Sequence, residues 1–166
     1  AKKHTVGEMI DKYCKEELPR KRETTKYGQS FQYKWWKQEI GYELLSNVSS
    51  PLLAECRDRL IHDPARGIER SPVTAKRYLA ALSHVFTVAL KDWRWIEENP
   101  VLKVRMPKES RGRVRFLSNA ERVTLLKACS TSQNRMLYPI VLMAISTGAR
   151  KGELLSLQWK DLDLTR

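Results

Sequence analysis

The segment from Ser71 to Trp93 shows the clearest helical repeat in the chain. Its apolar residues recur at intervals of three and four, the spacing that places them on one face of a helix. They are Tyr78, Leu79, Leu82, Val85, Phe86, Leu90 and Trp93. Ser71 suits the N-cap position, and Pro72 suits the first helical position, where a missing N–H breaks no hydrogen bond. The pattern therefore predicts a long amphipathic helix with one face turned inward.

Three earlier segments also have helical patterns. Thr5 to Leu18 opens with a threonine cap and has Glu8 three residues later, which is close to a capping box. Tyr27 to Glu39 carries aromatic residues four apart, and Pro51 to Ile61 follows Ser50 as its expected cap. We expect these segments and the long helix to form a compact four-helix bundle.

The chain changes character between Pro100 and Arg115. Six cations and one acid share these sixteen residues with two prolines, one glycine and no helical period. Such a composition predicts an extended basic linker. We therefore divide the chain into a helical domain over residues 1–99, a linker over 100–116 and a second domain over 117–166.

The second domain also begins as helices. Ser118 or Asn119 can cap a first helix, and Glu121 lies in its first turn. The run from Leu137 to Ile145 is almost wholly apolar and predicts a buried helix that ends near Ser146. Four aromatic residues on the helical patterns are expected in cores: Trp35, Trp36, Tyr78 and Tyr138.

Charge narrows the possible partners. The formal net charge is +12, from 31 basic and 19 acidic residues, which favours nucleic acid or an anionic membrane surface over a merely solvated surface. No run of 18 apolar residues and no secretory signal is present, so neither a membrane span nor export is expected. Cys14, Cys56 and Cys129 are odd in number and far apart, which predicts reduced thiols in a cytoplasmic protein and no metal site.

One short stretch combines a helix end with charge. Gly148 suits a helix C′ position, and a new helix is expected from about residue 149 to 157. Arg150 and Lys151 then fall in its first turn, where backbone N–H groups already attract anions, so a phosphate is the expected ligand. Glu153 lies three residues after Arg150 and can orient its guanidinium. A plain surface ion pair is the alternative from this pattern alone.

The same stretch carries a family resemblance. Its motif is Thr-Gly-x-Arg-x-x-Glu-Leu followed by Trp-x-Asp-Leu-Asp, formed by Thr147, Gly148, Arg150, Glu153, Leu154, Trp159, Asp161, Leu162 and Asp163. It resembles the first catalytic-arginine box of the tyrosine recombinases, the phage-integrase family. The long helix with its Asn-Pro exit and the segment "FLSNAERVTLLKAC" resemble that family's core-binding and catalytic domains. The resemblance implies an all-α chain: a four-helix SAM-like domain, then the helical start of a mixed α/β catalytic domain.

The resemblance also implies a chemistry. Arg150 would clamp the scissile phosphate, Glu153 would support it, and a tyrosine would form a 3′-phosphotyrosyl intermediate without metal or cofactor. The family's His-x-x-Arg box and nucleophilic tyrosine follow the arginine box, whereas all six tyrosines here precede Arg150. We therefore expect site-specific recombination or integration of phage or mobile-element DNA from a full-length enzyme, and DNA binding without cutting from these 166 residues.

Double-stranded DNA is the partner that the resemblance implies. The candidate contacts are Thr74, Lys76 and Arg77 on the long helix, Lys108, Arg111, Arg113 and Arg115 in the linker, and Lys151 beside the arginine box. On the second helix, Lys26, Gln29 and Gln32 could face the same groove of the DNA as the long helix. We expect a homotetramer on recombining DNA, a monomeric fragment without DNA, and a location in the bacterial cytoplasm on the nucleoid. The alternative is a helical DNA-binding module, such as a regulator, without recombinase chemistry.

Overall fold

The computed structural model describes residues 3–63, 67–108 and 115–161. The chain divides into two compact units, residues 1–111 and 112–166, which are described separately below. In the described part, regular structure is helical apart from a two-stranded antiparallel hairpin, β1 (His62–Asp63) with β2 (Ile68–Glu69).

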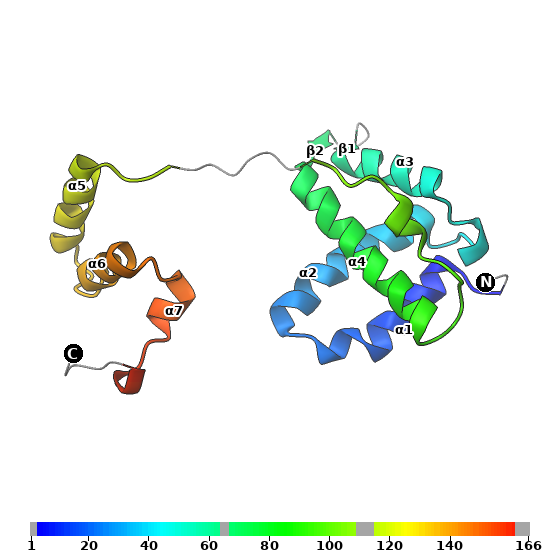
Figure 1. The fold of residues 1–166 in the computed structure, drawn as a ribbon, viewed down its shortest axis with the longest axis horizontal. Helices are drawn as coiled ribbons and strands as arrows, with labels where there is room; N and C mark the ends of the chain where they lie inside the picture. Colours follow the sequence, from blue (N-terminus) through cyan, green and yellow to red (C-terminus); the bar gives the residue numbers. More distant parts are fainter. Residues whose placement is uncertain (1–2, 64–66, 109–114, 162–166) are drawn as a thin grey trace. The chain divides into compact units, whose positions relative to one another are not determined.

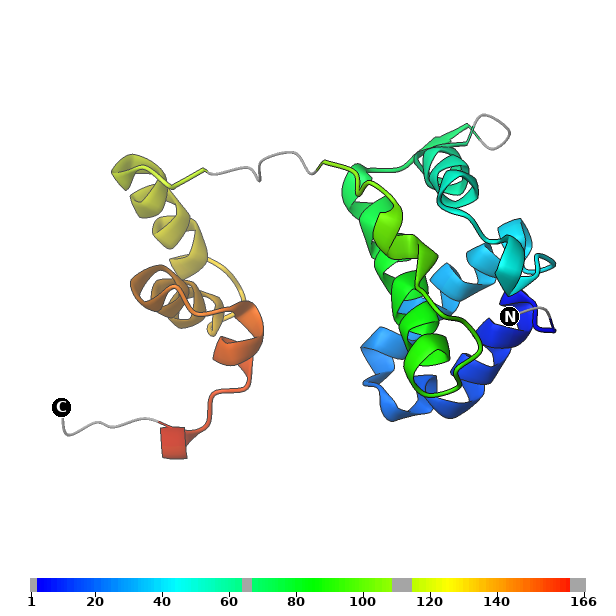
Figure 2. The same ribbon diagram turned by 45° about the vertical axis from the view of Figure 1, so that its right-hand side comes forward.

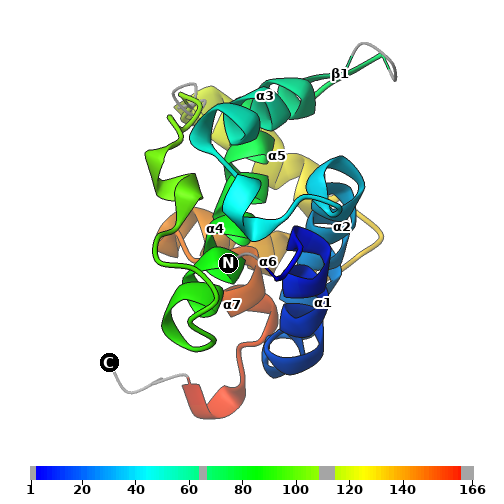
Figure 3. The same ribbon diagram turned by 90° about the vertical axis from the view of Figure 1, so that its right-hand side faces the viewer.

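Unit 1 is built around four α-helices (Figure 1). They are α1 (Val6–Glu16), α2 (Glu23–Ile40), α3 (Ser50–Ile61) and α4 (Pro72–Lys91). The helices α1 and α2 run side by side, joined by the 3-10 helix η1 (Leu18–Arg20) (Figure 3). The helix α4 contacts α1, α2 and α3, so its apolar face is covered by all three, and the predicted four-helix bundle is present.

The helix starts follow local sequence signals. Thr5 caps α1 in a complete capping box with Glu8, and Ser71 caps α4 in front of Pro72, both as predicted. Ser49, one residue earlier than expected, caps α3 by accepting from the N–H of Leu52. The helix α2 starts at Glu23, four residues before the predicted boundary. The apolar pattern missed this first turn because its residues are polar.

The core of unit 1 contains the aromatic residues expected there. Trp35 and Trp36 are buried and pack edge to face, and the indole of Trp36 donates to the carbonyl of Tyr78 at 2.9 Å. Tyr78 itself is half-buried against this core. Gly7 lets the start of α1 approach the end of α2, because a Cβ there would lie 2.8 Å from the carbonyl oxygen of Gly41.

The predicted linker does not begin at residue 100. Residues Pro100–Lys103 form the 3-10 helix η3, which lies against α4 (Figure 2). Val101 and Val104 are buried in the core of unit 1. The many cations of the segment predicted extended chain exposed to solvent. That prediction is wrong for this first part, because the two valines pack into the core of unit 1.

Unit 2 contains α5 (Asn119–Ser130), α6 (Leu137–Thr147), α7 (Lys151–Leu155) and the 3-10 helix η4 (Trp159–Asp161). The helix α6 contacts both α5 and α7. The prediction that α6 is buried is wrong here: none of its residues is buried, and Tyr138 is 38% exposed. The two neighbours α5 and α7 cover only part of a helix that is apolar on all sides.

Candidate nucleic-acid interface

The first turns of α4 present polar and basic side chains. The hydroxyl of Ser71 accepts from the backbone N–H of Thr74 at 3.3 Å, and the two hydroxyl oxygens lie 3.0 Å apart. Thr74 is half-buried in this cap, whereas Lys76 and Arg77 are exposed on the next turn. The N–H groups of the cap and the two cations give this end of the helix a positive potential.

A groove runs between α2 and α4. Its lining comes from both helices: Thr24, Thr25, Gly28, Gln29 and Gln32 on α2, and Arg77, Ala80, Ala81 and His84 on α4. The structure thus brings Gln29, Gln32 and Arg77, three of the candidate DNA contacts, together along one groove of the protein. Lys26 does not line the groove and pairs with Glu23 at 2.6 Å instead. Lys76 does not line it either.

Sequence reasoning missed Thr25 and His84 in this groove. A signal for both was present, because Thr25, Gln29 and Gln32 lie at helical spacing on one element. Arg77, Ala81 and His84 repeat that spacing on the other element. Two stripes of matching spacing on helices that pack together predict a shared groove, but the pairing of the two helices is a long-range contact.

Buried tyrosines support the groove from below. The hydroxyl of Tyr13 lies 3.0 Å from Nδ1 of His84, and the hydroxyl of Tyr33 donates to Oε1 of Gln29 at 3.3 Å. The ammonium of Lys21 donates to the same Oε1 at 3.0 Å. His84 is exposed at the groove, but partial desolvation of its ring, and then the charge of Lys21, lower its pKa, so its imidazole is neutral near pH 7. Burial also raises the pKa of Tyr33.

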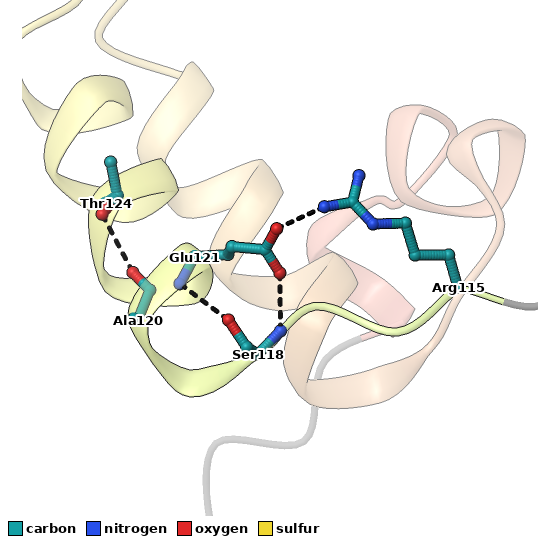
Figure 4. A network of polar contacts seen from close by, with 5 residues as sticks. All are labelled: Arg115, Ser118, Ala120, Glu121 and Thr124. Carbon is teal, nitrogen blue, oxygen red and sulfur yellow. Dashed lines mark hydrogen bonds and ion pairs between the residues drawn. The ribbon is translucent and has the colours of Figure 1, made fainter.

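The basic segment between the two units is described only in part. Lys108 is exposed. Arg111 and Arg113 lie outside the described residues. Arg115 is exposed and its guanidinium donates to the carboxylate of Glu121 (Figure 4). The candidate phosphate contact at Arg115 therefore already has an anionic partner, which a phosphate would have to share or replace.

Glu121 is held by the first turn of α5. Its carboxylate accepts from the backbone N–H of Ser118 at 2.9 Å, while the hydroxyl of Ser118 accepts from the N–H of Glu121 at 3.3 Å. These bonds and the contact with Arg115 lower the pKa of Glu121, the backbone N–H of Ser118 most of all. Ser118, one of the two caps that the sequence offered, forms a complete capping box with Glu121, and the hydroxyl of Thr124 donates to the carbonyl of Ala120 one turn further on (Figure 4).

The arginine turn in unit 2 has a defined local geometry. Gly148 ends α6 with φ 67°, the left-handed conformation predicted for it. Thr147 closes the turn, since its hydroxyl donates to the carbonyl of Met143 at 2.6 Å and accepts from the N–H of Ala149 at 3.2 Å. Arg150 then takes an extended conformation as the N-cap residue of α7, which starts at Lys151, two residues later than expected, and ends at Leu155.

Glu153 holds Arg150 at two points. Its Oε2 accepts from the backbone N–H of Arg150 at 2.8 Å, and its Oε1 accepts from Nη1 of the guanidinium at 3.0 Å. The side chain of Arg150 is nevertheless 87% exposed. A guanidinium has five N–H donors, so the remaining donors can take two oxygens of a phosphate. Lys151, exposed at the first position of α7, adds a second cation beside it.

Comparisons with known proteins place this geometry in a family. No family model matches the chain. A shufflon-specific DNA recombinase of Escherichia coli is 32% identical to it over 98% of the chain and 42% of the relative. A putative integrase of Pseudomonas phage Pf1 is 37% identical over 72% of the chain and 34% of the relative. The chain belongs to the tyrosine recombinase family. It spans less than half the length of the two tyrosine recombinase relatives named here.

Solved structures show the same fold. The Tn1549 transposon integrase in complex with circular intermediate DNA matches with a TM-score of 0.77 and 21% identity, over 98% of this chain and 52% of that one. A lambda integrase tetramer bound to a Holliday junction matches with a TM-score of 0.73 and 23% identity, over 96% and 43%. These matches confirm the predicted tyrosine recombinase fold.

Two absences concern the described residues alone. No group of histidine, cysteine, aspartate and glutamate side chains suited to a metal ion occurs among residues 3–63, 67–108 and 115–161. In the same ranges, no helix combines the length and the apolar character needed to cross a membrane.

Proposed function

We propose that this chain is the DNA-binding domain and the first catalytic-arginine segment of a site-specific recombinase. The full-length enzyme integrates or rearranges phage or mobile-element DNA through a phosphotyrosyl intermediate. The observation that carries the proposal is the exposed guanidinium of Arg150, held by Glu153, in a chain of the tyrosine recombinase family. The same proposal includes a helical DNA-binding domain and a catalytic domain joined by a basic segment, with Val101 and Val104 counted in the first domain because they are buried in its core.

Arg150 acts on the scissile phosphate. A tyrosine oxygen attacks phosphorus, the bond to the 5′ oxygen breaks, and the 5′-hydroxyl leaves with a proton. Negative charge grows on the phosphoryl oxygens in the transition state, where a preorganised guanidinium stabilises it. Glu153 keeps the guanidinium in position before DNA arrives, and Lys151 adds positive charge at the same turn. Religation to a new strand reverses the step, so no cofactor is needed.

Residues 1–166 alone bind DNA without cutting it. All six tyrosines precede Arg150, and Tyr13 and Tyr33 are buried under the groove of unit 1. The groove between α2 and α4 faces the bases, while Thr74, Lys76, Lys108, Arg111, Arg113 and Arg115 contact the backbone. The full-length enzyme works as a homotetramer on recombining DNA in the bacterial cytoplasm, at the nucleoid, and the fragment is monomeric without DNA.

A salt titration tests the DNA-binding part. The affinity of residues 1–166 for duplex DNA should fall steeply between about 50 and 200 mM salt, because bound cations release counterions from the phosphates. Lys108→Gln, which removes an exposed cation assigned to the DNA backbone, should lower the slope of log affinity against log salt by about one. Lys91→Gln, which removes an exposed charge at the last position of α4, is the matched control and should leave the slope unchanged. A flat salt response would contradict the proposal.

A further inference from the structure

Gln29 has a fixed orientation in the groove between α2 and α4. Its Oε1 accepts from the ammonium of Lys21 at 3.0 Å and from the hydroxyl of Tyr33 at 3.3 Å. An ammonium can only donate, so the amide atom that Lys21 contacts has to be the carbonyl oxygen. Two donors therefore point at that oxygen, the ammonium at an ordinary hydrogen-bond distance and the hydroxyl at a longer one. The carbonyl group of Gln29 is therefore already in use before any ligand enters the groove.

The two donors are themselves held. Tyr33 is 2% exposed and packs edge to face against Tyr13, which is fully buried. The ammonium of Lys21 lies 5.2 Å from the centre of the Tyr13 ring, a cation–π contact that fixes it over the same aromatic pair. Neither donor can turn away without losing a contact in or on the core, so the amide of Gln29 is positioned by the fold.

The amide NH2 is what Gln29 can offer to a ligand. A glutamine normally reads adenine with both its groups, accepting from N6 and donating to N7. Gln29 has no acceptor left for N6, so it can only donate. Arg77, which lines the same groove, is also a donor without acceptor capacity. In the major groove, the keto bases offer strong acceptors, O6 and N7 on guanine and O4 on thymine, whereas cytosine offers only a donor.

We infer that Gln29 is a specificity-determining residue that donates to the keto edge of a guanine or thymine in the DNA site. Lys21 and Tyr33 are positioning residues that hold its carbonyl away from the base. The inference rests on the proposed function, because it requires that the groove meets the bases of duplex DNA. It adds which base edges the groove selects and why a glutamine there does not select adenine.

Selection from a pool of randomised duplex DNA tests this inference. Residues 1–166 should enrich guanine or thymine at one position of the bound sequences. Gln29→Glu keeps the contacts of the carbonyl but removes the NH2, so this keto preference should fall by about fivefold or more and cytosine should gain. Gln38→Glu adds the same charge at an exposed position of α2 outside the groove, and it should bind with the wild-type preference.

Tyr33→Phe supplies the second arm. It removes one donor from Oε1 and should let the amide accept from adenine N6, so adenine should gain at the same position. If Tyr33 had only a structural role, Tyr33→Phe would lower stability without changing the base preference. A melting curve of each variant measures the loss of stability separately from the base preference. DNA binding with the wild-type base preference in both Gln29→Glu and Tyr33→Phe would overturn the inference alone. No binding to any duplex by the wild-type chain would overturn the proposed function with it.

Discussion

Arg150 shows how a side chain can matter for chemistry and little for folding. Its guanidinium is 87% exposed, and Glu153, its partner, is 55% exposed. An ion pair of this exposure contributes well under about 1 kcal/mol, because water screens both charges. The turn that carries it depends on Gly148 and Thr147, which make their contacts without the guanidinium.

Arg150→Ala should abolish strand cleavage by the full-length recombinase while changing the unfolding free energy by less than about 1 kcal/mol. Arg150→Lys should also be severely impaired, since an ammonium lacks the planar pair of donors. Glu153→Gln should be milder. Trapping of the covalent adduct on a suicide substrate measures the first effect, and a melting curve the second. Arg122→Ala removes another exposed arginine of unit 2 as the control. Normal adduct formation by Arg150→Ala would contradict the catalytic role.

His84 should make the stability of unit 1 depend on pH. Its pKa is lowered in the fold from the ordinary 6.5, first by partial desolvation of the exposed ring and then by the charge of Lys21. The unfolded chain therefore takes up the proton first, and the unfolding free energy should fall as the pH drops below about 6.5. His84→Gln should flatten this part of the profile in urea unfolding. His62→Gln, at an exposed position of β1, should leave it as in the wild type; a wild-type slope in His84→Gln would disprove the assignment.

At the scale of elements, the features that depend on residues close together in the chain could be predicted from the sequence. The caps at Thr5, Ser71 and Ser118 and the left-handed Gly148 depend on contacts within one turn, so their residue types were sufficient. The burial of Val101 depends on α4, which lies far from it in the chain, and no local pattern contains that contact.

The candidate site divides in the same way. The motif around Arg150 indicated a turn between two helices and an Arg–Glu contact, and both are present. The polar stripe of α2 was visible, but its meeting with His84 and the support from Tyr13 and Tyr33 require the packed bundle. Local chemistry could be predicted, whereas the partners of each stripe could not.

Asn99 is the residue that fixes η3 on α4. Its Nδ2 lies 2.9 Å from the carbonyl oxygen of Ser83 and 3.1 Å from the hydroxyl of Thr87, and its Oδ1 accepts from the N–H of Val101 at 3.0 Å. Apart from hydrophobic, aromatic and cysteine residues, it is the one buried side chain among the described residues, at 4% exposure. A polar network of this kind orients the chain leaving α4 because each buried group has a partner.

Asn99→Ala should lower the unfolding free energy of unit 1 by about 1–3 kcal/mol, since it leaves buried hydrogen-bonding groups without partners. Urea unfolding followed by circular dichroism measures the change. Asn47→Ala, at an exposed asparagine of the same unit, should stay within about 0.5 kcal/mol of the wild type. Equal effects of the two substitutions would show that the bonds of Asn99 contribute nothing specific.

At the scale of the whole molecule, the two units differ in how much they bury. Unit 1 has a continuous core with residues from all four of its α-helices. In the described part of unit 2, Cys129 is the one buried hydrophobic residue. Large apolar side chains of unit 2 are exposed instead: Phe116, Leu117, Val123, Leu125, Met136, Leu137, Tyr138, Leu142, Leu155, Leu157 and Trp159. Because buried apolar area supplies most of the stability of a domain, unit 2 on its own has little to hold it together.

Residues 1–166 should therefore open in two steps, with unit 2 first. In native-state hydrogen exchange, amides of α6 should exchange at least about a hundredfold faster than those in the middle of α4, which corresponds to about 3 kcal/mol less opening free energy. Thiol labelling supplies an independent measure, since Cys129 should react before Cys56, which lies in the core of unit 1. Equal protection of α6 and α4 would mean that the exposed apolar face of α6 is covered in solution. A second copy of the chain would then be the first partner to test for, by measuring whether protection depends on protein concentration.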